Sequence, residues 1–245
     1  MFVEIKPSLP KGRIKAPPSK SMAHRLLICA GLCEGESVIE NVAYSQDILA
    51  TLDCLEVLGA RVKKDGATVY IKGADPANFG GGCFPCRESG STMRFLIPVA
   101  MLSKEKSVFT GYGRLPERPL EDYEKLASEK ELLFYRSADG INVSGALEGG
   151  SFELRGDVSR QFITGLLFAL PIAEKDSTIT LTGKTESLGY IDMTVDALQK
   201  FGIEIEREAE NVFFIKGNQE YKPRQLTVEG DFSNAAFLDA FNLIG

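Results

Sequence analysis

The sequence predicts a mixed α/β (α+β) fold of three αβαββ repeats arranged around a pseudo-threefold axis. Two features support this prediction. Three segments that start at Ser19, Ser89 and Ser159 begin alike, follow one another at intervals of 70 residues, and each lead into an apolar run. Short strand-like runs close the units at intervals of 72 residues, ending in Gly73, Gly145 and Gly217. A unit of about 70 residues cannot bury two helices alone, so the three units must pack together.

Each unit repeats one succession of elements. An apolar run of helical length comes first, a β-type run follows, and a second helix and two short strands complete the unit. The apolar runs are residues 22–32, 92–102 and 162–172. The β-type runs are residues 37–42, 107–113 and 177–183. The second helix is more amphipathic, and in two units Gly59 or Gly202 marks its end, since glycine favours the conformation that stops a helix. Packing the three units together would place the apolar first helices inside.

The repeats also predict domain boundaries. Residues 16–225 form one complete domain, with units at about 16–73, 86–145 and 156–217. Ser233 starts the repeat again, 74 residues after Ser159, and the chain stops one helix later. We therefore expect a second domain to be missing. Residues 1–15 would be its orphan strand plus a linker, and residues 226–245 a linker and its first helix.

Composition excludes several classes of protein. The 245 residues carry a net charge of −6, with a pI near 5.1, which disfavours a nucleic-acid partner. No run approaches the ~18 apolar residues of a membrane span, and the N-terminus does not have the pattern of a signal peptide. We expect a cytoplasmic protein with no membrane partner.

The cysteines indicate reduced thiols. Cys29, Cys33 and Cys54 lie in apolar, helix-like stretches, where buried thiols are common. Cys83 and Cys86 form a C-x-x-C motif after three glycines, in an apparent loop. A zinc site takes about four ligands, and the chain has a single histidine, so we expect no metal here. A redox C-x-x-C motif normally lies where a strand leads into a helix. Because this one lies in an apparent loop, we do not expect a redox role.

The starts of the apolar helices predict an anion site. The lead serines are good N-caps, and in two units the next residue is a cation, Lys20 or Arg160. A cation is disfavoured there because the first helical turn already carries positive charge, but together with free N–H groups it suits a phosphate or carboxylate. Ser21 and Arg25 share one helix face, and Arg118 adds a cation on a loop braced by prolines. Solvated surface charge is the alternative interpretation.

Three further residue patterns bear on chemistry. His24 could be a general base, but no carboxylate is evident to orient it, which favours a structural role or a place at the edge of the site. Glu88 begins the second repeat, where a carboxylate also serves as a simple capping charge. The chain contains no glycine-rich nucleotide motif, and we expect no cofactor.

Five sequence blocks, in the expected order, resemble the 5-enolpyruvylshikimate-3-phosphate synthase family. They are residues 16–25 (APPSKSMAHR), 88–95 (ESGSTMRF), 115–119 (LPERP), 159–162 (SRQF) and 187–192 (SLGYID). The family has two similar domains of three βαβαββ units each, so this chain resembles one half of the two-domain enolpyruvyl transferase fold. The resemblance implies transfer of the enolpyruvyl group of phosphoenolpyruvate to the 5-hydroxyl of shikimate 3-phosphate, releasing phosphate, in chorismate and aromatic amino-acid biosynthesis. It implies no cofactor.

The resemblance also implies roles for individual residues. Lys20 would be catalytic and contact both substrates. Arg118 and Gly90 would contact phosphoenolpyruvate, and Gln161 would contact both substrates. The remaining residues expected to bind shikimate 3-phosphate are Ser21, Arg25, Ser159, Arg160, Ser187 and Tyr190. The family's acid–base carboxylates belong to the second domain, so we expect this chain to bind shikimate 3-phosphate weakly and not to turn over alone.

Departures from the family pattern leave alternatives open. Glu88 stands where asparagine is common, Arg160 where serine is common, and Phe95 where proline is frequent. The family is the target of glyphosate, and the Phe95 departure leaves sensitivity to it open. One alternative is an enzyme similar to UDP-N-acetylglucosamine enolpyruvyl transferase, although that group usually has Lys-Asn where this chain has Lys20-Ser21. The other alternative is a non-catalytic module of the same repeats.

Overall fold

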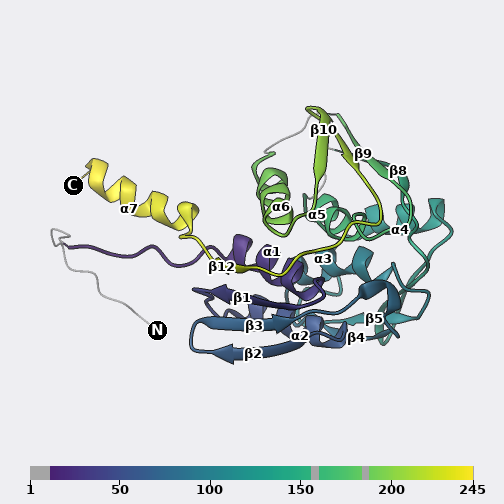
Figure 1. Ribbon diagram of the computed structural model, residues 1–245, viewed down its shortest axis with the longest axis horizontal. Helices are drawn as coiled ribbons and strands as arrows, with labels where there is room; N and C mark the ends of the chain where they lie inside the picture. Colours follow the sequence, from purple (N-terminus) through teal and green to yellow (C-terminus); the bar gives the residue numbers. More distant parts are fainter. Residues whose placement is uncertain (1–11, 156–159, 184–187, 245) are drawn as a thin grey trace.

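Three four-stranded sheets surround the helices at the centre of the molecule (Figure 1). The computed structural model describes residues 12–155, 160–183 and 188–244. The first sheet has the order β12 (Gln225–Thr227), β1 (Glu36–Glu40), β3 (Thr68–Lys72), β2 (Arg61–Asp65). The second has the order β4 (Gly82–Pro85), β5 (Ser107–Thr110), β7 (Gly140–Ser144), β6 (Leu133–Ser137). The third has the order β8 (Gly150–Arg155), β9 (Ser177–Thr182), β11 (Val212–Ile215), β10 (Ile205–Ala209). The three orders are equivalent, which confirms the predicted fold class.

The first strand of each sheet lies outside the predicted units. β4 and β8 run parallel to β5 and β9, ahead of the units expected at 86–145 and 156–217. In the first sheet the equivalent strand is β12, which runs parallel to β1 from almost two hundred residues away. The domain boundary expected at 225 falls inside this strand. The first repeat is therefore completed by a segment from the far end of the chain.

The first helix of each unit is buried, as predicted. α1 (Lys20–Gly31), α3 (Gly90–Ala100) and α5 (Arg160–Ala169) lie inside the ring of sheets, and their side chains form much of the core (Figure 1). The second helices are α2 (Gln46–Val57), α4 (Glu121–Glu129) and α6 (Gly189–Lys200), which bury only one face. A short 3-10 helix, η1, covers Pro76–Asn78. The amphipathic pattern of the second helices thus matches their position at the edge of the core.

The serines predicted to cap helices and the glycines predicted to end them do so where the structure describes them. The Ser19 and Ser89 hydroxyls each accept a backbone N–H of the first helical turn, which satisfies a group that has no partner inside the helix. Ser159 lies outside the described residues. Gly59 and Gly202 follow α2 and α6 with φ of +99° and +83°, a backbone conformation that glycine adopts at little cost.

The cysteines follow the prediction, with one correction. Cys29, Cys33 and Cys54 are buried. The C-x-x-C segment is not a loop, because Cys83 lies on β4 and Cys86 directly follows that strand. Cys83 is exposed, whereas Cys86 is buried with its Sγ 3.9 Å from Sγ of Cys54. The alternating faces of the strand separate the two thiols of the motif.

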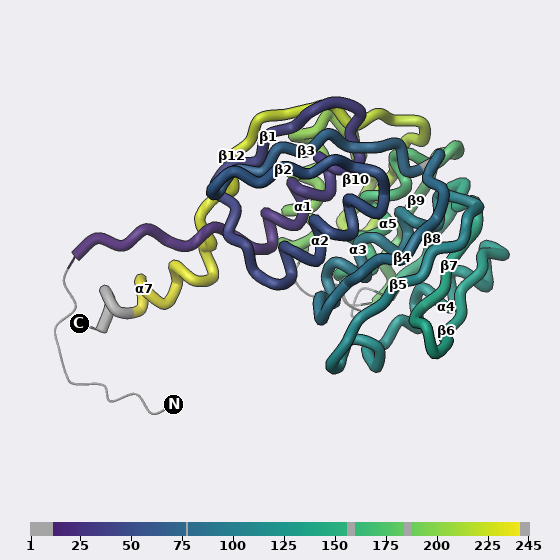
Figure 2. Tube along the Cα trace, turned by 90° about the horizontal axis from the view of Figure 1, so that it is seen from below, coloured from purple at the N-terminus to yellow at the C-terminus, as the bar shows by residue number. Residues whose placement is uncertain are grey.

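Two segments near the chain ends leave the three-sheet body side by side (Figure 2). An isolated antiparallel bridge joins Pro18 to Gly230, and the backbone N–H of Ser19 donates to the carbonyl of Glu229 over 2.8 Å. α7 (Phe232–Ile244) follows this crossing and projects from the body. Among the helices that the structure describes, none is long and apolar enough to cross a membrane.

Candidate anion-binding site

A cavity of about 410 Å³ lies at the starts of the three central helices and against α6. Its lining residues are Lys20, Ser21, His24, Arg25, Ser91, Phe95, Arg160, Gln161, Thr164 and Tyr190. Nine of these ten occupy the first two turns of α1, α3 and α5. Many are related by the 70-residue repeat, such as Ser21, Ser91 and Gln161. The repeat therefore creates the cavity by bringing three equivalent helix starts to one place.

Arg25 ties the first repeat to the third. The residue is only 3% exposed, and its guanidinium donates through Nε to Oγ1 of Thr194 over 2.9 Å and through Nη2 to the carbonyl of Tyr190 over 3.0 Å. Nη1 donates to the carbonyl of Ser21 on its own helix. Burial lowers the pKa of Arg25 to about 10, which still leaves it charged at neutral pH. Arg25 is thus both a packing residue and a fixed positive charge in the cavity wall.

Tyr190 brings a second arginine to the same wall. The guanidinium carbons of Arg25 and Arg160 lie 5.9 Å and 5.5 Å from the centre of its ring. Phe95 lies beneath Arg25, with the guanidinium carbon 5.5 Å from its ring centre. Aromatic faces attract cations at these distances and orient them without neutralising their charge. The wall therefore presents two oriented guanidinium groups.

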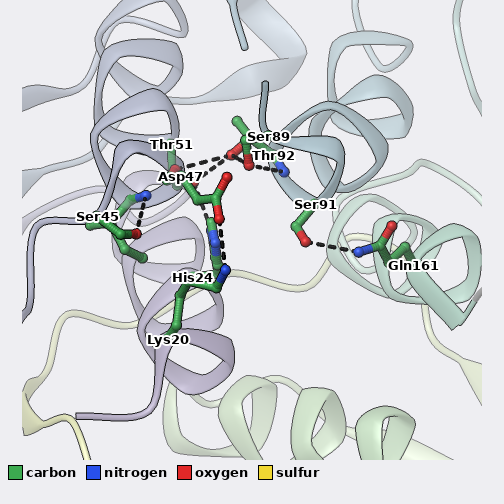
Figure 3. Close-up of polar contacts among 10 residues, drawn as sticks. Lys20, His24, Ser45, Asp47, Thr51, Ser89, Ser91, Thr92 and Gln161 are labelled. Carbon is green, nitrogen blue, oxygen red and sulfur yellow. Dashed lines mark hydrogen bonds and ion pairs between the residues drawn. The ribbon is translucent and has the colours of Figure 1, made fainter. Parts of the chain in front are cut away.

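Lys20 is paired with a residue that the sequence analysis did not single out. Its Nζ lies 2.7 Å from Oδ2 of Asp47 at the start of α2 (Figure 3). Partial burial acts to raise the pKa of Asp47, but hydrogen bonds from Lys20 and Ser89 and the nearby charges outweigh it, so the pKa lies below its ordinary value. The Lys20 side chain is 54% exposed, so it is held by one partner and remains accessible.

A chain of hydroxyl groups connects Asp47 to His24 beneath this pair (Figure 3). Contacts of 2.8 Å join Ser89 to Thr92, Thr92 to Thr51, and Thr51 to Nδ1 of His24. Burial is the main cause that lowers the pKa of His24 to about 3, with Lys20 and Arg25 adding to the effect and Asp47 opposing it. His24 is therefore neutral at physiological pH and only weakly basic, which argues against a role as general base.

Gln161 is held between two residues of α3. Its Nε2 donates to Oγ of Ser91 over 2.8 Å (Figure 3), and its Oε1 accepts from Nη1 of Arg94 over 2.7 Å. Nη2 of Arg94 donates to the carbonyl of Pro119 over 3.0 Å. Arg94 thereby connects Gln161 to the loop that carries Arg118.

Gly90 and Arg118 meet at the start of α3. A Cβ atom on Gly90 would overlap Nη1 of Arg118, so the guanidinium lies directly against the backbone of the helix start. Nη1 and Nη2 of Arg136 donate to the carbonyls of Pro116 and Arg118, which fixes the loop from its other side. Arg118 itself is exposed.

The structure thus brings together most residues predicted for the site. The cavity wall contains Lys20, Ser21, Arg25, Arg160, Gln161 and Tyr190. Gly90 and Arg118 lie beside each other at the start of α3 without lining the cavity. Ser159 and Ser187 lie outside the described residues.

Several residues of the site were not predicted from the sequence. Ser91 and Thr164 follow from the 70-residue repeat, since they are equivalent to Ser21 and His24. Asp47 and Thr51 lie on α2, outside the pattern, and only three-dimensional packing brings them to α1.

The cavity is suited to an anionic ligand that also carries hydroxyl groups. Two guanidinium groups and one ammonium group provide positive charge, and charge-assisted hydrogen bonds from such groups suit carboxylate and phosphate. Hydroxyl, amide and imidazole groups supply further hydrogen bonds. No carboxylate lines the cavity within the described residues, and those residues contain no group of three or more side chains able to hold a metal ion.

Comparisons with known proteins agree with this geometry. A family model described as "EPSP synthase (3-phosphoshikimate 1-carboxyvinyltransferase)" matches residues 6–244. Two curated relatives, both named 3-phosphoshikimate 1-carboxyvinyltransferase, come from Clostridium perfringens and Clostridium acetobutylicum. The first is 44% identical over 248 residues, covering 99% of this chain and 58% of the relative. The second is 48% identical over 242 residues, covering 96% of this chain and 56% of the relative.

A solved structure shows the same fold. An EPSP synthase from Acinetobacter baumannii superposes with a TM-score of 0.79 at 24% sequence identity, covering 92% of this chain and 51% of that one. The chain therefore spans a little over half the length of the relatives that it matches.

Proposed function

The chain belongs to the EPSP synthase family, and on that premise we propose that its cavity is one side of the site that binds shikimate 3-phosphate and phosphoenolpyruvate. The observation that carries the proposal is the convergence of Lys20, Arg25 and Arg160 on one cavity of about 410 Å³. In a protein with a net charge of −6, such local positive charge implies an anionic ligand.

The proposed binding roles fall into two regions, one for shikimate 3-phosphate and one for phosphoenolpyruvate. Arg25 holds the shikimate carboxylate, and Ser21 and Tyr190 hold the ring beside it. Arg160 contributes to the 3-phosphate site together with Ser159 and Ser187. Gly90, Arg118 and Gln161 contact phosphoenolpyruvate, and Gln161 also reaches shikimate 3-phosphate.

Lys20 serves both substrates. Its ammonium group lies at the mouth of the cavity, where it contacts the phosphoenolpyruvate anion and the attacking hydroxyl. In the overall reaction the 5-hydroxyl oxygen adds to C2 of phosphoenolpyruvate while C3 takes a proton. The resulting tetrahedral ketal then loses phosphate and the C3 proton. Fixed cations stabilise the charge that develops on the leaving phosphate.

We propose that turnover requires the part of the protein that the relatives have and this chain does not. In this proposal the described residues from 16 to 227 form the three-repeat body, and residues 228–244 lead toward a second domain. The acid–base carboxylates of the family belong to that domain. The chain alone then binds shikimate 3-phosphate weakly, because four charge-assisted contacts of ~1.5–3 kcal/mol are largely offset by association costs of ~4–15 kcal/mol.

Ligand-dependent thermal stability tests the proposal, since a ligand that binds only the folded state raises the melting temperature. Shikimate 3-phosphate should raise it in a saturable way, whereas UDP-N-acetylglucosamine and a generic polyanion should not. Stabilisation by the UDP-sugar would favour the sister enolpyruvyl transferase of peptidoglycan synthesis. Stabilisation by any polyanion would favour a non-catalytic module.

A further inference from the structure

His24 has one ring nitrogen in a hydrogen bond and one without a partner. Nδ1 lies 2.8 Å from Oγ1 of Thr51 on α2. Nε2 is buried and has no hydrogen-bond partner within the described residues. His24 as a whole is only 2% exposed, yet its side chain lines the cavity. A buried polar atom without a partner is unfavourable, so its position calls for an explanation.

Counting protons along the hydroxyl chain indicates which nitrogen carries the hydrogen. The Thr92 hydroxyl donates to Oγ of Ser89 over 2.8 Å, which leaves the Ser89 proton for the nearby carboxylate of Asp47. The 2.8 Å contact between Thr92 and Thr51 then requires the proton of Thr51.

Only one donor remains for the contact between Thr51 and His24. The Thr51 hydroxyl has one proton and two acceptors other than His24, Oγ1 of Thr92 at 2.8 Å and the carbonyl of Asp47 at 3.2 Å, so the hydrogen bond between Thr51 and His24 uses an N–H on Nδ1. The neutral imidazole then carries its lone pair on Nε2. The carboxylate of Asp47 thus fixes the tautomer of His24 through three hydroxyl groups.

The cavity lies on the side of His24 away from α2. Nδ1 contacts Thr51 on α2, and none of the described residues that line the cavity belongs to α2. Phe95, which also lines the cavity, packs edge-on against the imidazole with ring centres 6.2 Å apart. Lys20, four residues earlier on the same face of α1, has a half-exposed side chain held by Asp47.

We propose that His24 is a fixed hydrogen-bond acceptor of this site, which selects ligands that carry a hydroxyl group over bare anions. Nε2 accepts the ligand hydroxyl after the side chains that bury it shift on ligand binding. This inference rests on the proposed function, since shikimate 3-phosphate supplies both the hydroxyl groups and the anions. No proton is transferred, so His24 is a specificity-determining residue rather than a general base.

The single histidine of the chain makes a direct test possible, because ¹⁵N labelling of histidine gives the two ring signals of His24 alone. Long-range ¹H–¹⁵N spectra at neutral pH should show the tautomer protonated at Nδ1. A ring protonated at Nε2, or at both nitrogens, would overturn the inference. Thr51→Val removes the hydroxyl partner and should shift the population toward the Nε2–H tautomer. Thr180→Val, the same change at a half-buried position of β9, should leave it unchanged.

Ligand titration tests the second half of the inference. Shikimate 3-phosphate should move the Nε2 resonance upfield, as hydrogen bonding to a lone pair does. Sulfate, an anion with no hydroxyl, should not. His24→Asn keeps a donor toward Thr51 but cannot accept at the Nε2 position. It should lower the affinity for shikimate 3-phosphate about five- to tenfold, the value of one hydrogen bond, and leave sulfate affinity unchanged.

The outcomes separate this inference from the proposed function. Saturable binding of shikimate 3-phosphate with an unmoved Nε2 resonance would contradict the role of His24 and leave the proposed function standing. Complete absence of binding by a folded chain would contradict the proposed function and the ligand half of the inference together. The tautomer measurement is decisive in either case, since it needs no ligand.

Discussion

The Nε atom of Arg25 on α1 donates a 2.9 Å hydrogen bond to Oγ1 of Thr194 on α6. This contact joins two residues 169 positions apart and closes the first repeat onto the third. The same Thr194 hydroxyl donates to the carbonyl of Tyr190 and meets the hydroxyl of Thr164, so one hydroxyl organises this side of the cavity. The arginine that supplies charge to the site therefore also holds its walls together.

Thr194→Val should destabilise the chain by about 1–3 kcal/mol, because it leaves the buried Nε of Arg25 without an acceptor. Urea unfolding measures this free energy. Thr180→Val on β9 is the matched control and should change the stability by much less. Equal effects of the two substitutions would show that the contact between Arg25 and Thr194 contributes nothing specific.

Gly90→Ala should weaken phosphoenolpyruvate binding about tenfold while leaving the fold intact. The added Cβ would overlap Nη1 of Arg118 and push this exposed, flexible side chain away from the helix start. Loss of one well-placed charge-assisted hydrogen bond costs about 1.5–3 kcal/mol. Calorimetry in the presence of shikimate 3-phosphate checks the affinity. Gly189→Ala, at the start of α6 with open space around it, is the control and should have no effect.

Asp47→Asn should reduce stability by up to about 1 kcal/mol at neutral pH, since the ion pair with Lys20 is partly exposed. The pKa of Asp47 is depressed in the folded chain, so its contribution is present above the unfolded pKa of about 4 and is lost as pH falls through the folded value. The difference in unfolding free energy between wild type and variant, measured by urea unfolding, should shrink below pH 4. A constant difference down to pH 2 would contradict this.

His24 should give the chain a pH-dependent stability in weakly acidic solution. Its pKa is about 3 when folded, against an ordinary value of 6.5, so between these values the unfolded state binds one more proton. Stability should fall by up to about 1.4 kcal/mol for each unit of pH lost in this window. Between pH 6 and pH 5, where carboxylates titrate little, His24→Asn should remove this slope. An unchanged slope would mean that His24 is charged in the folded chain.

One of the five cysteines should react rapidly with a maleimide in the folded chain. Cys83 is exposed on β4, and the other four are buried. Mass spectrometry should find one fast label under native conditions and five after unfolding. Cys83→Ser should abolish the fast label. Rapid labelling of Cys86 as well would show that the two thiols of the motif share an accessible surface.

The repeat could be predicted from sequence because it leaves a periodic signal. Helices that are apolar on every face must be buried, and serines at equal spacing must begin equivalent helices, so the core and the helix starts followed directly. The cations Lys20 and Arg160 could be predicted because their position at helix starts has a clear electrostatic meaning, and Arg25 because it shares a helix face with Ser21.

The first strand of each sheet escaped prediction for physical reasons. β4 is short, begins at the last of three successive glycines and contains Pro85, which only an edge strand tolerates. β12 pairs with β1 across almost the whole chain, and no local pattern specifies so distant a partner. The chain of hydroxyl groups from Asp47 to His24 could not be predicted either, because these groups belong to α2 and to the start of α3 and come together only when the helices pack.

Calorimetric titration of shikimate 3-phosphate into the chain tests most directly the claim that the three helix starts form one side of a substrate site. Arg25 is unsuitable for substitution here because it holds α6, so the comparison is Lys20→Ala with Arg160→Ala. The control is Arg61→Ala with Lys64→Ala on β2, which removes the same charge from an exposed strand. We predict saturable binding in the millimolar to high micromolar range for wild type and control, and its loss in the Lys20 and Arg160 variant. Equal binding by both variants, or a dissociation constant below about 1 μM, would contradict the account.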